Sequence, residues 1–260
     1  MIRLVATDLD GTLLYPDGEM PEGIFDCIRE LAERGIRFAA ASGRPTGSVR
    51  QLFAPVADQI DFICENGALV IARGRQRAAY FPRPMAEEII RDLQAAGLEL
   101  FLSAPERCYG ITNASAAFID ETVHRGFNIS FIDDPLPGAD GYIKITGFHV
   151  DAARVAPPLQ QKWQGKVHCD IAGDHWLDFT LASKGSGIRT LAEALDIPLC
   201  EAAAFGDQFN DVSMLELVGH PYVMAHAPAP LLQMGFQPCE DVMDTLRAIL
   251  RQANGGSSQC

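Results

Sequence analysis

The stretch that decides the fold is the run Ile2-Arg3-Leu4-Val5-Ala6-Thr7 followed directly by Asp8-Leu9-Asp10-Gly11-Thr12. The first run is apolar and of strand length, and two carboxylates two positions apart follow it without a break. Open α/β sheets bind their ligands beyond the carboxyl ends of the strands, so both carboxylates are expected to face one crevice. Two like charges this close imply a bound Mg²⁺, a shared proton or both, and the alternative is an acidic turn without a ligand.

The pattern of an apolar strand followed by a helix recurs along the chain. Further strands are predicted at 36–41, 62–64, 202–205 and 222–225, and helices at 21–34, 185–195, 212–218 and 241–252. Strands that alternate with helices predict a parallel sheet covered on both faces. The sequence therefore predicts an α/β fold with a Rossmann-like parallel-sheet core at 1–82 plus 183–252, an inserted α+β cap domain at 83–182, and a flexible tail at 253–260.

Within the insertion the pattern favours antiparallel strands. The hairpin-like pair Val167–Ile171 and Trp176–Leu181 is joined by Ala172-Gly173-Asp174, which is typical of antiparallel pairing. Two further strands are predicted near 98–103 and 141–149, and helices near 85–96, 113–125 and 151–163. Pro157-Pro158 lies inside the last of these helices and argues against it.

Composition restricts the partners. The 260 residues are 48% hydrophobic and carry a formal net charge of −13, a charge that repels nucleic acid and anionic membranes. No apolar run is long enough to span a bilayer, and the first residues resemble a strand rather than a signal peptide. The seven cysteines include no Cys-x-x-Cys pair, which argues against a zinc site and for a reducing compartment. We expect a cytoplasmic protein that binds a small phosphorylated metabolite; its oligomeric state is left open.

A second acidic group is Gly206-Asp207-Gln208-Phe209-Asn210-Asp211, which also follows an apolar strand. Two more carboxylates at a strand end can complete an oxygen-rich site for a hard cation such as Mg²⁺. For Asp211 the alternative is a helix N-cap, since a helical pattern begins at Val212. Asp207 precedes that helix by several residues, so capping explains it less well.

Two shorter patterns supply a hydroxyl and a cation. Ser42-Gly43-Arg44 follows a strand, where a hydroxyl and a glycine amide can form a small anion cradle or a plain N-cap. Lys184 stands between the insertion and a helix, and taken alone it is a solvated charge. Together the four groups provide a carboxylate nucleophile, an acid/base carboxylate, a metal site, a hydroxyl and a cation. Displacement at phosphorus requires this combination.

In this order, four motifs resemble those of the haloacid dehalogenase (HAD) superfamily: Asp8-Leu9-Asp10-Gly11-Thr12, Ser42-Gly43-Arg44-Pro45, Lys184-Gly185 and Gly206-Asp207-x-x-Asn210-Asp211. The large insertion between the second and third motifs, preceded by Glu65-Asn66-Gly67-Ala68, is similar to that of the Cof-type (subfamily IIB) phosphatases. The resemblance covers essentially the whole chain except the tail. It implies Mg²⁺-dependent hydrolysis of small phosphate monoesters such as sugar phosphates, nucleotides or phosphorylated cofactors.

The resemblance also implies roles for individual residues. Asp8 would form an aspartyl-phosphate, and Asp10 would protonate the leaving alcohol and then activate water. Ser42 and Lys184 would complete the catalytic set. Mg²⁺ would be held by Asp8, the Asp10 carbonyl and Asp207, with support from Asp211. The phosphoryl oxygens would be bound by Ser42, Lys184, Asn210 and the amides of Leu9 and Gly43.

Substrate contacts and alternative functions stay open. Arg44, Asn66 and His175 are candidates to contact the substrate. Met224-Ala225-His226-Ala227 departs from the usual Met-Gly-Asn-Ala of the family, so His226 is either a spectator or a substrate contact. The alternatives to a phosphatase are a phosphosugar mutase, a phospho-acceptor signalling module and a non-catalytic phosphate-binding relative. The signalling module is disfavoured because receiver domains are much shorter and lack the insertion.

Overall fold

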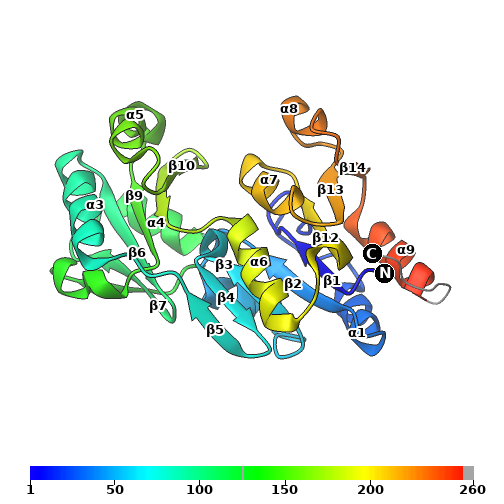
Figure 1. Ribbon diagram of the computed structural model, residues 1–260. Helices are drawn as coiled ribbons and strands as arrows, with labels where there is room; N and C mark the ends of the chain where they lie inside the picture. Colours follow the sequence, from blue (N-terminus) through cyan, green and yellow to red (C-terminus); the bar gives the residue numbers. More distant parts are fainter. Residues whose placement is uncertain (125, 254–260) are drawn as a thin grey trace. The chain divides into compact units, whose positions relative to one another are not determined.

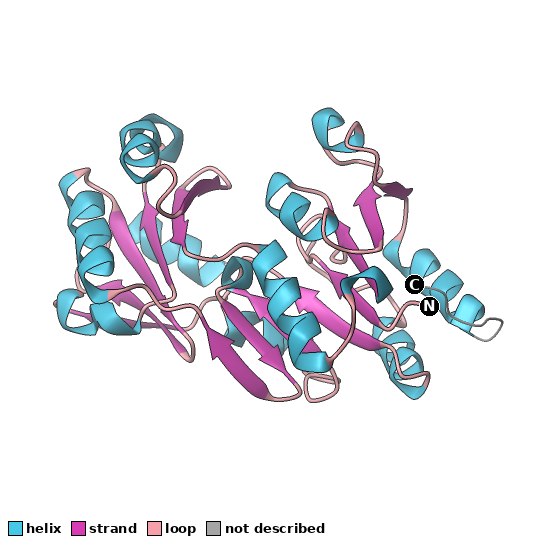
Figure 2. Cartoon of the chain, viewed as in Figure 1, coloured by secondary structure: helices cyan, strands magenta, loops and turns pink. Residues whose placement is uncertain are grey.

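The structure, a computed structural model, describes residues 1–124 and 126–253, so the predicted tail 253–260 lies outside the described residues apart from Ala253. Its strands form two separate sheets (Figures 1 and 2). The chain divides into two compact units. The first contains 1–43, 49–77 and the chain from Ser183 onward, and the second contains 44–48 and 78–182. Among the described helices, none is long and apolar enough to cross a membrane.

The first unit is built on an eight-stranded sheet with the order β14-β13-β12-β1-β2-β3-β4-β5. The strands from β14 to β3 run parallel, and β4 turns back antiparallel to β3. The strands are β1 (Leu4–Thr7), β2 (Arg37–Ala41), β3 (Asp61–Cys64), β4 (Leu69–Ala72), β5 (Arg75–Ala78), β12 (Ala202–Gly206), β13 (His220–Met224) and β14 (Gln237–Cys239).

Several helices of this unit pack on the sheet through an apolar face. The helices are α1 (Ile24–Glu33), α2 (Thr46–Leu52), α6 (Lys184–Leu195), α7 (Phe209–Leu215), α8 (Ala229–Leu232) and α9 (Val242–Ala253), with short 3₁₀ turns at Glu65–Gly67 and Leu199–Glu201. Ile188 and Leu191 of α6 and Met214 of α7 pack in one buried cluster with Leu4 and Ala6 of β1. Helix α1 packs against β2 and α9.

Strand register sets the motifs side by side. Parallel pairing aligns Thr7 of β1 with Phe205 of β12 and with Ala40 of β2. The Asp8 amide then donates to the Phe205 carbonyl at 3.0 Å, so the residues after all three strands meet at one edge of the sheet. This edge holds the carboxyl ends of the parallel strands, where the sequence predicted the site.

The second unit contains a six-stranded sheet with the order β10-β11-β9-β6-β7-β8, antiparallel except for the parallel pair β7 and β8. Its strands are β6 (Glu99–Ala104), β7 (Arg107–Ile111), β8 (Ile129–Ile132), β9 (Lys144–Phe148), β10 (His168–Ala172) and β11 (Trp176–Thr180). Its helices are α3 (Arg83–Ala95), α4 (Ala116–His124) and α5 (Ala152–Trp163), with a 3₁₀ turn at Leu136–Gly141. Strands β7 and β8 are absent from the sequence prediction.

Helix α5 continues through Pro157 and Pro158, against the expectation that they would interrupt it. An interior proline costs roughly 3 kcal/mol. The buried face of the helix opposes that cost, because Ala156, Leu159 and Trp163 join the apolar cluster between α3, α5 and the sheet. Each large buried side chain contributes roughly 1.5–3 kcal/mol. The predicted fold class, a Rossmann-like parallel core with an inserted α+β domain, is confirmed by this architecture.

Candidate active site

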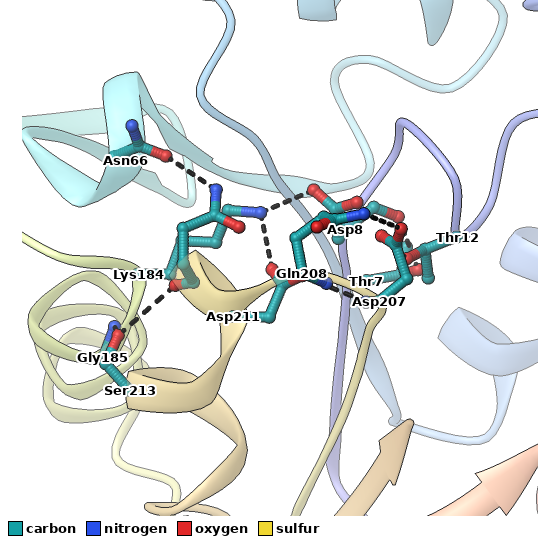
Figure 3. A network of polar contacts seen from close by, with 11 residues as sticks. Thr7, Asp8, Thr12, Asn66, Lys184, Gly185, Asp207, Gln208, Asp211 and Ser213 are labelled. Atoms are coloured by element: carbon teal, nitrogen blue, oxygen red, sulfur yellow. Dashed lines mark hydrogen bonds and ion pairs between the residues drawn. The ribbon is translucent and has the colours of Figure 1, made fainter. Parts of the chain in front are cut away.

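Lys184 connects Asp8, the predicted nucleophile, with Asp211, which was predicted to support the metal site. Its ammonium donates to Asp8 Oδ1 at 2.5 Å and to Asp211 Oδ1 at 2.6 Å, and all three side chains are buried (Figure 3). Lys184 is the first residue of α6, whose N-terminus is fixed by reciprocal hydrogen bonds between Ser183 and Ser186. The isolated lysine of the sequence is therefore a buried ion-pair partner and not a solvated charge.

Asp207 is held next to the turn that follows β1. Its Oδ1 accepts the Thr12 hydroxyl at 2.9 Å, and its Oδ2 accepts the Gln208 amide at 2.9 Å. Gly11 permits this approach, because a Cβ there would stand 2.5 Å from Asp207 Oδ2. Gly11 also has a φ of +83°, which glycine adopts without a steric cost.

Of the two roles that its sequence position left open, Asp211 shows helix capping, in the first turn of α7, and its role in a metal site stays a prediction. Its Oδ2 accepts the backbone amides of Asp207 and Gln208 at 3.1 and 3.0 Å, which caps α7, while its Oδ1 binds Lys184. Gly206 allows this close packing, because a Cβ there would lie 2.4 Å from the Asp211 Cβ. Asp211 is consequently committed on both oxygens to protein donors.

The cluster carries excess negative charge. Oxygens of Asp8, Asp207 and Asp211 lie within 4.8 Å of one another, and Lys184 is the cation bonded to two of them. Burial, with the charges of Asp211 and Asp207, raises the pKa of Asp8 from 3.8 to about 7 although Lys184 opposes the shift. Burial lowers the pKa of Lys184, but the charges of Asp211 and Asp8 outweigh it and raise that pKa above its ordinary value. Hard oxygen donors with uncompensated charge fit a Mg²⁺ ion.

A second group of polar residues lies beside this cluster. Ser42 is buried at the end of β2, and its carbonyl accepts the Asn66 amide at 3.1 Å. The Asn66 side chain packs against Gly43, where a Cβ would come within 3.0 Å of Asn66 Oδ1. That oxygen accepts the Asn210 side-chain amide at 3.3 Å. Asn66, a candidate substrate contact from the sequence, thus connects Gly43 with Asn210.

His226 contacts the loop that carries the first two aspartates. Its Nε2 lies 2.7 Å from the carbonyl oxygen of Gly11. The contact places His226 beside the loop that contains Asp10. The sequence could not indicate this proximity, because residue 226 follows β13 and is far from residue 10 along the chain. The one sequence signal was that a histidine stands where the family usually has asparagine.

The remaining predicted residues occupy separate environments. Asp10 is exposed in the turn after β1, and Leu9 is buried with its carbonyl accepting the amides of Thr12 and Leu14. Arg44 is half-buried and groups with the second unit. His175 also belongs to the second unit, where its ring packs edge-on against Phe148 at 5.9 Å.

Comparison with known proteins identifies the family of this chain. Residues 5–235 match the model of haloacid dehalogenase-like hydrolases. An HMP-PP phosphatase from Cronobacter sakazakii is 28% identical over 240 residues, covering 89% of this chain and 87% of the relative. A crystal structure from Eubacterium rectale superposes with a TM-score of 0.86 at 26% identity, covering 95% and 99% of the two chains. A HAD subclass IIB sugar phosphatase shares the fold at 16% identity with a TM-score of 0.80, covering 95% and 98%. The resemblance predicted from the four motifs is confirmed.

Replacement of Lys184 by methionine tests the buried ion pairs. Lys184→Met keeps the volume of the side chain but leaves Asp8 and Asp211 without their cation. Loss of one partner of a buried pair costs about 3–5 kcal/mol of unfolding free energy. Urea denaturation in EDTA should show this loss, and Lys184→Met with Asp211→Asn should recover part of it. Lys162→Met, which removes a lysine that forms two ion pairs at the surface, is the control and should change little. An equal effect of both methionine variants would contradict the assignment.

The pKa of Asp8 predicts how pH and Mg²⁺ change stability. The pKa of Asp8 is 3.8 in the unfolded chain and about 7 in the folded protein. At pH values between these two, the carboxyl is protonated in the folded protein and ionised in the unfolded chain. It therefore favours folding at low pH, and this contribution is lost as the pH rises through 7. The melting temperature in EDTA should fall from pH 5.5 to pH 8, and Mg²⁺ should raise it more at pH 8, where protons no longer compete.

Asp8→Asn is the variant for this experiment, and Asp17→Asn, an exposed carboxyl of the same unit, is the matched control. Asp8→Asn should reduce both the pH dependence and the response to Mg²⁺, whereas Asp17→Asn should behave like the wild type. A Mg²⁺ response of the same size at both pH values would show that Asp8 does not take part in metal binding.

Proposed function

Because this chain belongs to the haloacid dehalogenase-like hydrolase family, we propose that it hydrolyses small phosphate monoesters through an aspartyl-phosphate on Asp8. The observation that carries the proposal is the buried position of Asp8, which Lys184 binds at 2.5 Å within a cluster of further carboxylates. The names of relatives support the class of substrate, since HMP-PP phosphatases are among them.

In the first step a carboxylate oxygen of Asp8 attacks phosphorus, and the bond from phosphorus to the leaving oxygen breaks. Asp10 gives its proton to that oxygen, so the alcohol leaves neutral. In the second step Asp10 takes a proton from water as the water oxygen attacks the aspartyl-phosphate. Phosphate leaves, and Asp8 and Asp10 return to their starting protonation states.

The other residues of the site would bind the phosphoryl group and Mg²⁺ and would position Asp8. Lys184 orients the Asp8 carboxylate and would face the transferred phosphoryl group, with Ser42, Asn210 and the amides of Leu9 and Gly43 as further donors. Asp8, Asp207 and the Asp10 carbonyl would hold Mg²⁺, with Asp211 acting through a water because its oxygens already accept protein donors. A bound Mg²⁺ supplies charge neutralisation at the phosphoryl oxygens and keeps Asp8 ionised near neutral pH.

A screen over phosphorylated metabolites, with Mg²⁺ or EDTA, tests the proposal. The panel should include HMP-PP and hexose phosphates. We expect Mg²⁺-dependent release of phosphate, background activity from Asp8→Asn, and a loss of about 10²–10⁴-fold in kcat from Asp10→Asn. Asp17→Asn is the control. Near wild-type turnover by Asp8→Asn would exclude it as the nucleophile, and conversion of a hexose phosphate to its isomer without phosphate release would indicate a mutase.

His226 is expected to position the loop of Asp10 through the Gly11 carbonyl. Loss of one hydrogen bond costs about 1 kcal/mol, so His226→Ala should lower kcat roughly fivefold. His226→Asn, which can still donate a hydrogen bond and restores the usual family residue, should recover most of that loss. If the histidine bound substrate instead, both variants would raise KM and leave kcat unchanged.

A further inference from the structure

Three arginines stand on the β4–β5 hairpin, far in the sequence from the catalytic motifs. Arg73 lies in the turn, and Arg75 and Arg77 follow at alternate positions of β5, the last strand at one edge of the eight-stranded sheet (Figure 1). All three line a cavity of about 380 Å³, whose remaining walls are Val70, Ala72 and Ala194. We refer to this space, lined by these six residues, as the arginine cavity.

The three arginines of the arginine cavity are exposed to solvent. Among the described residues, none of the three forms an ion pair within 4.0 Å. The carboxylate next to Arg73 is Asp61, which accepts the Arg73 backbone amide at 2.8 Å. Asp61 already accepts two hydrogen bonds from Arg37, from its Nε at 2.9 Å and its Nη2 at 2.7 Å. Three exposed cations thus line one cavity with no ion-pair partner among the described residues, in a chain whose formal net charge is −13.

The turn residue itself is unusual. Arg73 and Gly74 have φ values of +48° and +75° in a two-residue hairpin turn. Asparagine, aspartate or glycine normally occupies the first of these positions, because other side chains are strained at positive φ. An arginine there costs backbone strain and adds a third cation to the cavity.

The position of the arginine cavity separates it from the catalytic carboxylates. Asp8 follows the carboxyl end of the parallel strands, whereas Arg73 lies beside Asp61, the first residue of β3. Arg73 and Asp8 therefore lie at opposite ends of the parallel strands. Charged residues on an edge strand also prevent edge-to-edge aggregation, but that role does not require them to line a cavity.

We propose that the arginine cavity binds a small polyanion, a molecule with two or more adjacent phosphate or carboxylate groups. Guanidinium groups match such groups in bidentate geometry. The volume falls within the range of small-molecule sites, and the walls of Val70, Ala72 and Ala194 provide an apolar surface for a compact ligand. Nucleic acid is disfavoured, because its affinity rests on many phosphate contacts and the chain as a whole is acidic.

Calorimetric titration of the full chain in EDTA, with pyrophosphate, citrate and acetate, tests the proposal. We expect pyrophosphate and citrate to bind at one site per chain beyond any binding at the catalytic site, and acetate not to bind. The triple variant Arg73→Gln, Arg75→Gln, Arg77→Gln should lose at least tenfold in affinity. The matched control Arg29→Gln, Arg247→Gln, Arg251→Gln removes the same charge from α1 and α9 and should bind as the wild type does. Both triple variants keep the catalytic site, so binding there cancels in the comparison.

A second measurement uses only the wild type, so its result does not depend on whether the triple variant folds. Pyrophosphate or citrate should slow the modification of Arg73, Arg75 and Arg77 by phenylglyoxal, located by mass spectrometry, while Arg247 and Arg251 react at unchanged rates. Equal affinity of the two triple variants, or no protection of the three arginines, would overturn the proposal. Either result would leave the proposed phosphatase activity unaffected.

Discussion

The arrangement of the catalytic carboxylates in the first unit depends on the ammonium of Lys184. It binds carboxylates from residues 8 and 211, so three segments far apart in the sequence meet at one buried cation. Burial of each ion costs several kcal/mol before pairing compensates it. The compensation is incomplete, because Asp207 adds a further buried charge and the pKa of Asp8 rises to about 7. The fold thus maintains an excess of buried negative charge that a divalent cation can neutralise.

Small residues allow the segments to come this close. A Cβ on Gly185 would stand 2.3 Å from the Ser213 carbonyl, and a Cβ on Gly187 would stand 2.5 Å from the Ile63 side chain. Helix α6 therefore packs directly on α7 and β3, and its first residue reaches the end of the sheet. The Gly185 amide also donates to the Ser213 hydroxyl at 3.0 Å, which joins the two helices beside the ion pairs.

The sequence predicted the parallel core and the meeting of Asp8 with Asp207, because both follow apolar strands and parallel strands end at the same edge. It did not predict contacts that depend on loop geometry, such as His226 with Gly11 or Asn66 with Asn210. Strand β7 escaped prediction because Gly110 within it resembles a turn residue. The structure explains that glycine, since a Cβ there would come within 2.9 Å of the Phe131 ring on β8.

The glycine at position 206 is required by close packing, and its presence can be used to separate active from inactive relatives. Any side chain at this position would occupy the space of the Asp211 Cβ, which lies 2.4 Å from where its first carbon would stand. Asp211 would have to move, and Lys184 would lose one of its two carboxylates. Homologues that keep the aspartates at positions 8, 10, 207 and 211 but replace this glycine are therefore expected to be catalytically inactive. Their catalytic residues would be present in the sequence but displaced in the structure.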